Sequence, residues 1–301
     1  MKKKNKKLLS AIIILLLLIF YYSTNNNVDT SNSKKEETIP VINNVTSDLN
    51  IYYFDVGQAD SILIRNNNTN MLIDAGNNAD GDLLVDYIKN KLQITKIDIV
   101  MGTHPHEDHI GGLDDIINNF DISEVYLPEV ITTTKTFEDV LTAIENKNLE
   151  ITIPNKGDKF TLGQANFEII FPGIDSGDLN EASIITKMTY GKLSYLFTGD
   201  TTDKIEKTIL TNNLDIDVLK VAHHGSKYSS TKEFLDLATP SHAIISVGEN
   251  NSYNHPEPEA IKRIEEHTNN IYMTKDKGTI HLTSDGENIN INTIKTNTNG
   301  W

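Results

Sequence analysis

Short apolar runs recur along most of the chain and predict many strands with helices between them. Runs of about four to eight residues rich in Ile, Leu, Val, Phe and Tyr, bounded by Asn, Asp or Gly, are typical of buried strands. They lie at residues 51–54, 61–64, 71–73, 97–101, 124–127, 160–162, 167–171, 183–190, 194–198, 217–222, 243–247, 270–274, 278–283 and 289–294. Helical spacing of apolar residues predicts helices at 82–92, 113–120, 137–146, 232–238 and 257–267, and another after Asp200, with Thr136 capping helix 137–146.

The second half of this pattern repeats the order of the first half. A sheet must bury its apolar face against another layer, so two successive sets of strands predict two sheets packed together with helices outside. The expected fold class is a mixed α/β, four-layer αββα sandwich.

The first 49 residues lack this pattern and predict an export segment followed by a tether. Five lysines and one asparagine follow Met1, and an apolar run then extends from Leu8 to Tyr22. This is the layout of a signal peptide or an uncleaved membrane anchor. Residues 23–49, rich in Asn, Ser, Thr and Lys, predict a flexible linker. We therefore expect residues 1–22 to contact the membrane and a globular domain at residues 50–301 to lie outside it, anchored or secreted.

Composition restricts the chemistry of this domain. The chain has no cysteine, so any transition metal must be held by histidine and carboxylate side chains. Residues 1–49 hold seven lysines and four acidic residues, and the rest of the chain, with 20 basic and 38 acidic side chains, has a net charge of -18. So acidic a domain repels polyanions at long range and lacks the basic stripe of proteins that grip duplex nucleic acid.

A histidine-rich run directly follows the predicted strand 97–101. It contains His104, His106, Asp108 and His109 and ends in a double glycine. His104 and His106 alternate along an extended loop, so both rings can point the same way and hold one ion, while Asp108 and His109 can hold a second. Imidazole and carboxylate ligands with open positions suit two Zn²⁺ or Mn²⁺ ions, which activate a shared water for hydrolysis. A solvated polar loop is the alternative, but it does not account for this spacing.

The run resembles the HxHxDH motif of the metallo-β-lactamase superfamily. Asp74-Ala75-Gly76 is similar to that family's early Asp-x-Gly, whose Asp supports the metal loop, and Thr198-Gly199-Asp200 to its Gly-Asp, whose Asp bridges both metals. His223-His224-Gly225-Ser226 is similar to a segment with a later metal-binding His. The resemblance implies a metallo-β-lactamase-like αββα fold, two divalent ions, Zn²⁺ or Mn²⁺, and the ligands His104, His106, Asp108, His109, Asp200 and His223.

Within this superfamily, the chain resembles the extracytoplasmic hydrolase domain of ComEC-type competence proteins over residues 50–294. The stretches that carry this likeness are Phe54–Ser61, the histidine-rich run, Asn180–Ser183, Leu219–Ser226 and Tyr253–Pro256. Many superfamily members have a His about 20 residues before the Gly-Asp, whereas this chain, like the ComEC-type branch, has none between residues 110 and 222. That absence predicts a more open site that is readier to use manganese.

Three residues are predicted to contact the substrate or nucleophile. Asp108 is expected to orient the nucleophile in addition to binding metal. His223 directly follows a strand and is chosen as the ligand, so His224 is expected to stabilise charge on a leaving oxygen or phosphate. His255 is expected to act as an acid or substrate contact, with a packing role equally open. Asp55 and Asp60 are expected to shape a loop near the site and support it.

The resemblance implies hydrolysis of phosphodiester bonds outside the membrane, with single-stranded DNA as one candidate substrate. Hydrolysis of small phosphoesters, choline-phosphate esters or lactones is an alternative, and a metal-containing surface binding module is the non-enzymatic one. Lactam hydrolysis and flavin-linked diiron reduction are disfavoured, since the latter relatives have Glu where His106 stands. No stable protein partner is expected.

Overall fold

The computed structural model describes residues 49–210 and 214–294. These residues belong to one compact unit, Asn44–Trp301. The predicted signal or anchor at residues 1–22 and the predicted linker up to residue 48 lie outside the described residues. Within the described part, no helix has the length and apolar character needed to cross a bilayer.

Two mixed sheets form the centre of the domain. In the described residues the first sheet has eight strands in the order β15-β14-β1-β2-β3-β4-β5-β6, and the second has seven in the order β13-β12-β11-β10-β9-β8-β7. The strands are β1 (Leu49–Tyr53), β2 (Ser61–Asn66), β3 (Thr69–Ala75), β4 (Lys96–Met101), β5 (Asp121–Tyr126), β6 (Ile151–Thr152), β7 (Lys159–Leu162), β8 (Ala165–Phe171), β9 (Ile185–Tyr190), β10 (Leu193–Phe197), β11 (Val218–Lys220), β12 (His242–Ile245), β13 (Ile271–Met273), β14 (Thr279–Ser284) and β15 (Ile289–Ile294).

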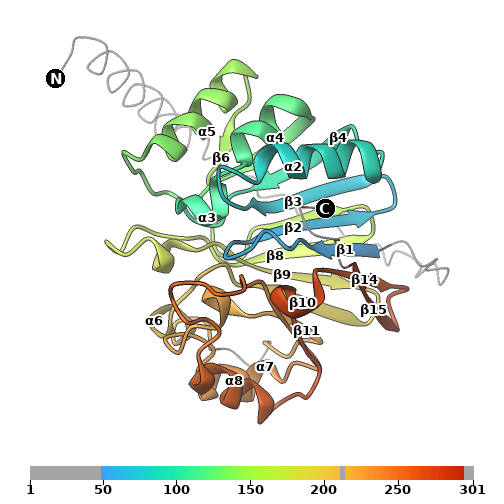
Figure 1. Ribbon diagram of the computed structural model, residues 1–301, viewed down its shortest axis with the longest axis vertical. Coiled ribbons are helices and arrows are strands. Elements are labelled where there is room, and N and C mark those ends of the chain that lie inside the picture. Colours follow the sequence, from blue (N-terminus) through green and yellow to red (C-terminus); the bar gives the residue numbers. More distant parts are fainter. Residues whose placement is uncertain (1–48, 211–213, 295–301) are drawn as a thin grey trace, which may run out of the picture. The chain divides into compact units, whose positions relative to one another are not determined.

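Helices cover the outer face of each sheet (Figure 1). On the first sheet these are α2 (Gly81–Asp86), which continues as the π-helical turn η1 (Tyr87–Lys91), α4 (Leu113–Asn119) and α5 (Lys135–Asn146). On the second they are α6 (Asp203–Glu206), α7 (Lys232–Ala238) and α8 (Pro258–Glu265). Short helical turns lie in the connecting loops: α3 (Glu107–Ile110), η2 (Asn180–Ala182), η3 (Ala222–Gly225) and α9 (Thr274–Lys277).

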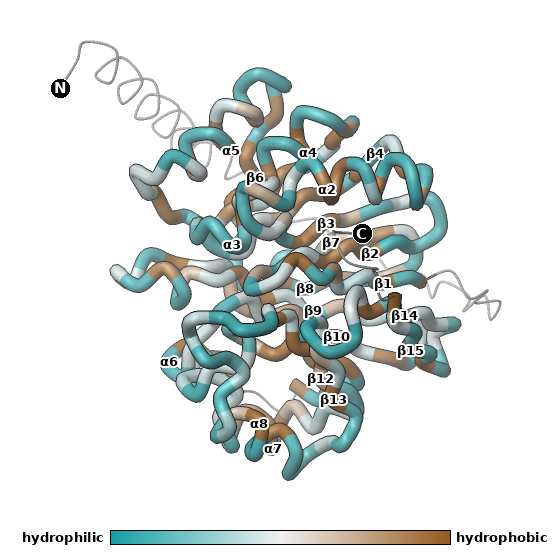
Figure 2. The backbone as a smooth tube through the Cα atoms, in the orientation of Figure 1, coloured by the Kyte–Doolittle hydropathy of each residue, from teal (hydrophilic) through white to brown (hydrophobic). Residues whose placement is uncertain are grey.

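Apolar side chains fill three layers between these elements. Figure 2 shows hydrophobic positions along the strands in the middle of the domain. The central layer joins both sheets, with Ile73 and Met101 from the first and Phe167 and Phe197 from the second. The other two layers lie between each sheet and its helices. The predicted αββα sandwich is thereby confirmed.

Several predicted boundaries differ from the structure for local reasons. Thr134, and not Thr136, caps α5: its Oγ1 accepts the Phe137 N–H at 3.3 Å, while the Thr136 hydroxyl turns to Asn78. The strand predicted from residue 183 begins at Ile185, because residues 180–182 form a turn. The last two strands, β14 and β15, return to the first sheet beside β1, which the repeated pattern did not predict.

Parallel pairing brings the candidate residues to one edge of the sandwich. Strand β3 pairs in parallel with β4, and β11 pairs in parallel with both β10 and β12. Parallel strands end at the same edge of a sheet. The segments after β3, β4, β10 and β11 are those that contain the motifs singled out above, and they meet beside α3 (Figure 1).

Candidate metal centre

The histidine-rich run leaves β4 as an extended loop and then enters α3. His106 is the N-cap of α3 and has an extended backbone conformation, so Asp108 and His109 belong to the first helical turn. His104 and His109 are fully buried, whereas His106 and Asp108 are partly exposed. His104 and His106 therefore project from an extended loop, whereas Asp108 and His109 project from a helical turn.

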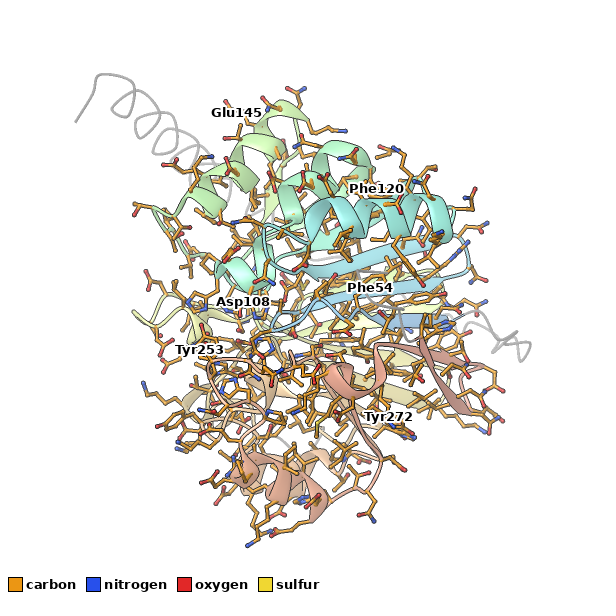
Figure 3. All side chains as sticks on the ribbon, viewed as in Figure 1. Phe54, Asp108, Phe120, Glu145, Tyr253 and Tyr272 are labelled. Carbon is orange, nitrogen blue, oxygen red and sulfur yellow. The ribbon has the colours of Figure 1, made fainter. Side chains whose placement is uncertain are left out.

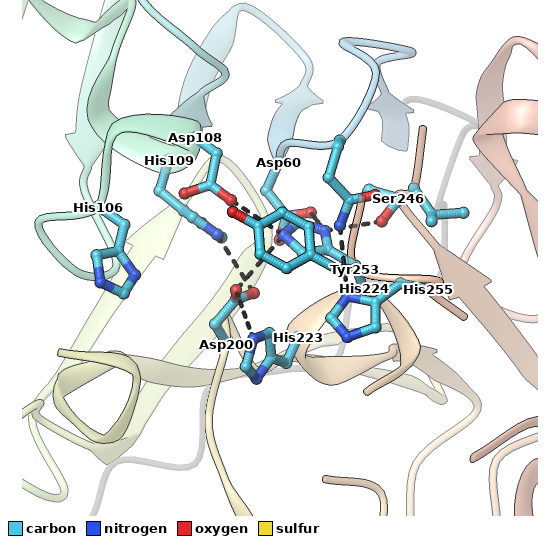
Figure 4. A network of polar contacts seen from close by, with 12 residues as sticks. Asp60, His106, Asp108, His109, Asp200, His223, His224, Ser246, Tyr253 and His255 are labelled. Carbon is cyan, nitrogen blue, oxygen red and sulfur yellow. Dashed lines mark hydrogen bonds and ion pairs between the residues drawn. The ribbon is translucent and has the colours of Figure 1, made fainter. Parts of the chain in front are cut away.

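Four side chains from both halves of the fold converge on one point (Figure 4). Asp108, His109, Asp200 and His224 each offer one donor atom, and these atoms lie within 4.8 Å of one another. The His109 Nε2 is 3.3 Å from Asp200 Oδ1, and the His224 Nε2 is 3.4 Å from both Asp200 Oδ2 and Asp108 Oδ2. Asp200 thus lies between the two histidines.

The donor atoms of this cluster fit a divalent cation. The Nε2 atoms of His109 and His224 and the Oδ1 of Asp200 are buried and have no hydrogen-bond partner. Buried polar atoms without partners are costly and rare, so a group of three at one point indicates a ligand. Neutral imidazole nitrogen and carboxylate oxygen are donors that Zn²⁺ and Mn²⁺ accept.

Partners on the far side of each ring fix which nitrogen faces the cluster. The His109 Nδ1 is 2.8 Å from Asp74 Oδ2, and the His224 Nδ1 is 2.9 Å from the Ser246 carbonyl oxygen. Because carboxylate and carbonyl oxygens accept hydrogen bonds, both rings donate from Nδ1 and direct Nε2 toward the cluster. Asp74 also accepts hydrogen bonds from the amide and hydroxyl of Thr103, so it holds the start of the metal loop.

His104 and His106 form a second position beside this cluster. The His104 Nε2 is 3.0 Å from His106 Nδ1, and the His104 ring centroid is 4.1 Å from that of His109. The Ser183 Oγ lies 3.3 Å from His104 Nδ1 and accepts the Asp200 N–H at 3.0 Å. A serine therefore supports both positions from the segment where many superfamily members have a further histidine.

His223 and His224 lie differently with respect to the donor cluster. His224 is 2% exposed and belongs to the four clustered donors, whereas the His223 side chain is 23% exposed and its Nε2 lies 3.9 Å from Asp200 Oδ2. The cause is the backbone: both residues adopt left-handed conformations with φ of 52°, so the chain turns sharply after β11 and does not continue the strand's alternation. The choice of His223 over His224 rested on its place directly after the strand.

His255 lies next to the cluster and outside it. Its ring centroid is 5.4 Å from that of His223, and its Nδ1 is 3.5 Å from the Gln58 Nε2. Tyr253 stacks beside it at 5.7 Å, with 64% of the residue exposed. Figure 3 shows Tyr253 and Asp108 on the same side of the domain, and Figure 4 shows the tyrosine ring in front of the cluster. The sequence motif contained Tyr253, but nothing in its pattern gave the residue a role.

The charged groups of the cluster strongly shift one another's protonation. Burial lowers the pKa of His109, but the carboxylates of Asp200 and Asp74 raise it well above its usual value. Burial raises the pKa of Asp108, but the nearby side chain of His224 and the charge of His109 bring it down to about 2. Burial, with His223 and His224 nearby, lowers the pKa of His255 to about 4. Without a cation, the buried carboxylates thus raise the pKa of His109 and of His224 and favour the protonated form of both rings.

More than half of the chain matches a known protein family. The family model described as "Metallo-beta-lactamase superfamily" matches residues 54–249. The chain belongs to the metallo-β-lactamase superfamily. Its αββα layers are thus a feature of the superfamily, and the histidine-rich run and Asp200 lie within the matched residues.

Curated relatives confirm the ComEC-type resemblance. "ComE operon protein 3" of Bacillus subtilis (strain 168) is 28% identical over 257 residues, which cover 78% of this chain and 33% of that protein. "Competence protein ComA" of Neisseria gonorrhoeae is 26% identical over 235 residues, 76% of this chain and 31% of that protein. The chain spans about a third of the length of these relatives.

Solved structures support the fold alone. CmlA, a diiron β-hydroxylase from Streptomyces venezuelae, matches with a TM-score of 0.52 and 14% identity, over 79% of this chain and 54% of that one. Igni18, a metallo hydrolase from the archaeon Ignicoccus hospitalis, matches with a TM-score of 0.50 and 18% identity, over 78% of this chain and 98% of that one.

Proposed function

We propose that this chain is a phosphodiesterase that uses two divalent metal ions, Zn²⁺ or Mn²⁺, and acts outside the membrane. The observation that carries the proposal is the convergence of Asp108, His109, Asp200 and His224, with three of their donor atoms buried and without hydrogen-bond partners. Membership of a superfamily of metallo-hydrolases supports the same chemistry.

The proposed ligands divide into two groups around a shared carboxylate. Asp108, His109 and His224 would hold one ion, His104 and His106 would hold the other, and Asp200 would supply the shared carboxylate. This assignment gives His224 the ligand role that the sequence pattern gave to His223, because the His224 Nε2 faces the cluster. Ions held here would lower the pKa of a water molecule and stabilise the charge of the phosphate.

The remaining polar side chains are assigned to the substrate and the attacking water. The partly exposed carboxylate of Asp108 would accept a hydrogen bond from the attacking water and keep the water directed at phosphorus. His223, more exposed and next to Asp200, donates a hydrogen bond to the leaving oxygen or to the phosphate. His255, whose pKa of about 4 keeps it neutral at pH 7, contacts the substrate without donating a proton from a cationic ring.

The proposed substrate is a phosphodiester with a planar group, of which single-stranded DNA is one example. Two of the curated relatives are named "Recombination protein 2", from Haemophilus influenzae, and "Competence protein ComA". The exposed ring of Tyr253 beside the cluster offers a surface on which a base can stack. The net charge of -18 over residues 50–301 opposes binding of single-stranded and duplex DNA alike along the surface, so contacts at the metal centre and Tyr253 have to supply the affinity. The basic and apolar N-terminal pattern supports an extracytoplasmic location.

Turnover of two substrates by the full-length chain tests the proposal. After chelation and reloading with Mn²⁺ or Zn²⁺, we expect hydrolysis of bis-p-nitrophenyl phosphate and of end-labelled single-stranded DNA. Asp200→Asn and His106→Ala should abolish it, while His267→Ala, which removes a contact with Asp236 outside the cluster, should not. Full metal occupancy without turnover of either substrate would contradict the proposal. Hydrolysis of small phosphoesters, choline-phosphate esters or lactones alone would favour the enzymatic alternative, and metal binding without any turnover the binding module.

A further inference from the structure

A buried lysine, Lys220, pairs with Asp60 next to the donor cluster, and the proposed chemistry does not use it. Lys220 is 1% exposed, and no other lysine or arginine among the described residues is buried. Its Nζ is 2.6 Å from Asp60 Oδ2 and donates a hydrogen bond to the Val221 carbonyl oxygen at 3.0 Å. The residue ends the otherwise apolar strand β11, two positions before the turn that contains His223 and His224.

A buried ion pair of this kind is not explained by stability. Removing two charges from water costs several kcal/mol for each ion, and apolar replacements of such pairs are often neutral or stabilising. Buried pairs are better attested as devices that fix one arrangement among several. The surroundings of Asp60 show what arrangement this pair fixes.

Asp60 touches three of the segments that build the metal centre. Its backbone N–H donates to the Asp108 carbonyl oxygen at 3.1 Å, and its backbone carbonyl accepts the Gly76 N–H at 2.8 Å. Its second carboxylate oxygen, Oδ1, is buried without a hydrogen-bond partner and lies 3.6 Å from His224 Nδ1. Figure 4 shows Asp60 behind Asp108 and beside His224.

The charge of Lys220 decides where the Asp60 carboxylate is held. Asp60, Asp74, Asp108 and Asp200 lie at one site, and among the described lysines and arginines Lys220 is the one that pairs with any of them. The Lys220 ammonium holds the Asp60 Oδ2, and the Asp60 Oδ1 lies near the His224 Nδ1. The same His224 Nδ1 donates its hydrogen bond to the Ser246 carbonyl oxygen. Without the ammonium, an unpaired buried carboxylate would compete for the His224 Nδ1 proton and turn the ring.

We propose that Asp60 and Lys220 are a positioning pair that locks His224 and the Asp108 loop in the geometry for binding metal. The pair joins the first half of the fold, through the segment before β2, to the second half, through β11. The inference rests on the metal centre described under the proposed function, but it concerns metal affinity and requires no hydrolysis.

Titration of the metal-free full-length chain with Mn²⁺, followed by calorimetry and by the electron paramagnetic resonance of free Mn²⁺, tests the pair. Asp60→Asn and Lys220→Met should each weaken Mn²⁺ binding about 10- to 100-fold, as loss of an outer partner of a metal ligand does. Lys192→Met is the matched control, since Lys192 forms an exposed pair with Glu287 at the same 2.6 Å distance. It should leave Mn²⁺ affinity unchanged.

The double variant Asp60→Asn/Lys220→Met separates positioning from stability. It leaves no buried charge unpaired, so its metal-free unfolding midpoint should recover relative to the single variants while its Mn²⁺ affinity stays low. Wild-type Mn²⁺ affinity in Asp60→Asn or in the double variant would overturn the proposal, even if Lys220→Met alone fails to fold. Absence of both Mn²⁺ and Zn²⁺ binding in the wild-type protein would overturn the proposed function and this inference together. Tight binding without hydrolysis would contradict the proposed function alone.

Discussion

At the scale of single residues, the direction of a ring matters more than the presence of a histidine. His223 and His224 are neighbours of the same type, yet the left-handed backbone turns one toward Asp200 with its Nε2 in the cluster and leaves the other partly exposed. Single non-glycine residues in this conformation are strained and collect at functional sites. The two residues should therefore respond differently to the same substitution.

Alanine in place of each histidine separates ligand from substrate contact. His224→Ala removes a cluster donor, so we expect metal affinity to fall at least about 100-fold, more than for loss of an outer partner. His223→Ala should bind metal nearly normally and lose turnover of bis-p-nitrophenyl phosphate. Calorimetry and steady-state kinetics on the same preparations measure both effects. Equal losses of metal affinity in the two variants would contradict the assignment.

Protons and metal ions should compete for the same ring nitrogens. Neighbouring carboxylates raise the folded-state pKa of His109 and His224 against the effect of burial. Such groups stabilise the metal-free fold below the unfolded pKa of about 6.5, and this stabilisation is lost as pH rises through the raised folded value. We expect the unfolding temperature of chelated protein to fall from about pH 6 to 8 while apparent metal affinity rises. A metal affinity independent of pH over this range would contradict the prediction.

At the scale of elements, the candidate metal ligands lie in the segments that follow the strands. The turns in these segments must allow the two sheets to approach each other. Gly199, between β10 and Asp200, has a φ of +50°, and a Cβ there would lie 2.9 Å from the Ser183 side chain. Ser183 in turn contacts His104 and the Asp200 amide. This turn therefore sets the position of the carboxylate between the two halves.

Gly199→Ala should damage both folding and metal binding. The left-handed backbone alone costs a non-glycine residue about 1–2 kcal/mol, and the close contact with Ser183 adds to that. Gly157→Ala is the control, because Gly157 also has a positive φ, of 88°, but open space around its missing Cβ. Urea unfolding should show the larger loss for Gly199→Ala, and only this variant should bind Mn²⁺ more weakly. Equal effects would show that crowding at Gly199 is unimportant.

At the scale of the whole domain, the metal centre joins the two halves of the sandwich. Donors come from the α3 turn of the first half and from the segments after β10 and β11 of the second. A ligand that binds only the folded state stabilises it, by about 2.7 kcal/mol at a concentration 100 times its dissociation constant. Cations held by both halves should therefore stabilise the domain against unfolding.

Metal should raise the unfolding free energy of the wild-type protein by about 2–4 kcal/mol at 100 to 1,000 times the dissociation constant. Urea titrations with Mn²⁺ and with chelator give the difference. Asp200→Asn, which loses the shared carboxylate, should show little of this metal-dependent stabilisation, whereas His267→Ala should retain the stabilisation in full. A full metal effect in Asp200→Asn would place the ions elsewhere.

The sequence by itself determined the strands, the layers and the main candidate segments. Apolar periodicity is local, so runs such as 97–101 and 167–171 could be located without tertiary information, and the clustering of His104, His106, Asp108 and His109 is a property of a few consecutive residues. Local signals also misplaced the cap of α5, because several threonines lie within one turn of its start.

Only the tertiary structure decided which distant side chains meet. The return of β14 and β15 to the first sheet, the place of His224 within the cluster and the contact of Asp60 with Lys220 all join segments far apart in the chain. A repeating apolar pattern does not encode which strand pairs with which, nor the backbone angles of one turn. Those depend on packing between the two sheets, and the metal centre lies where that packing brings their edges together.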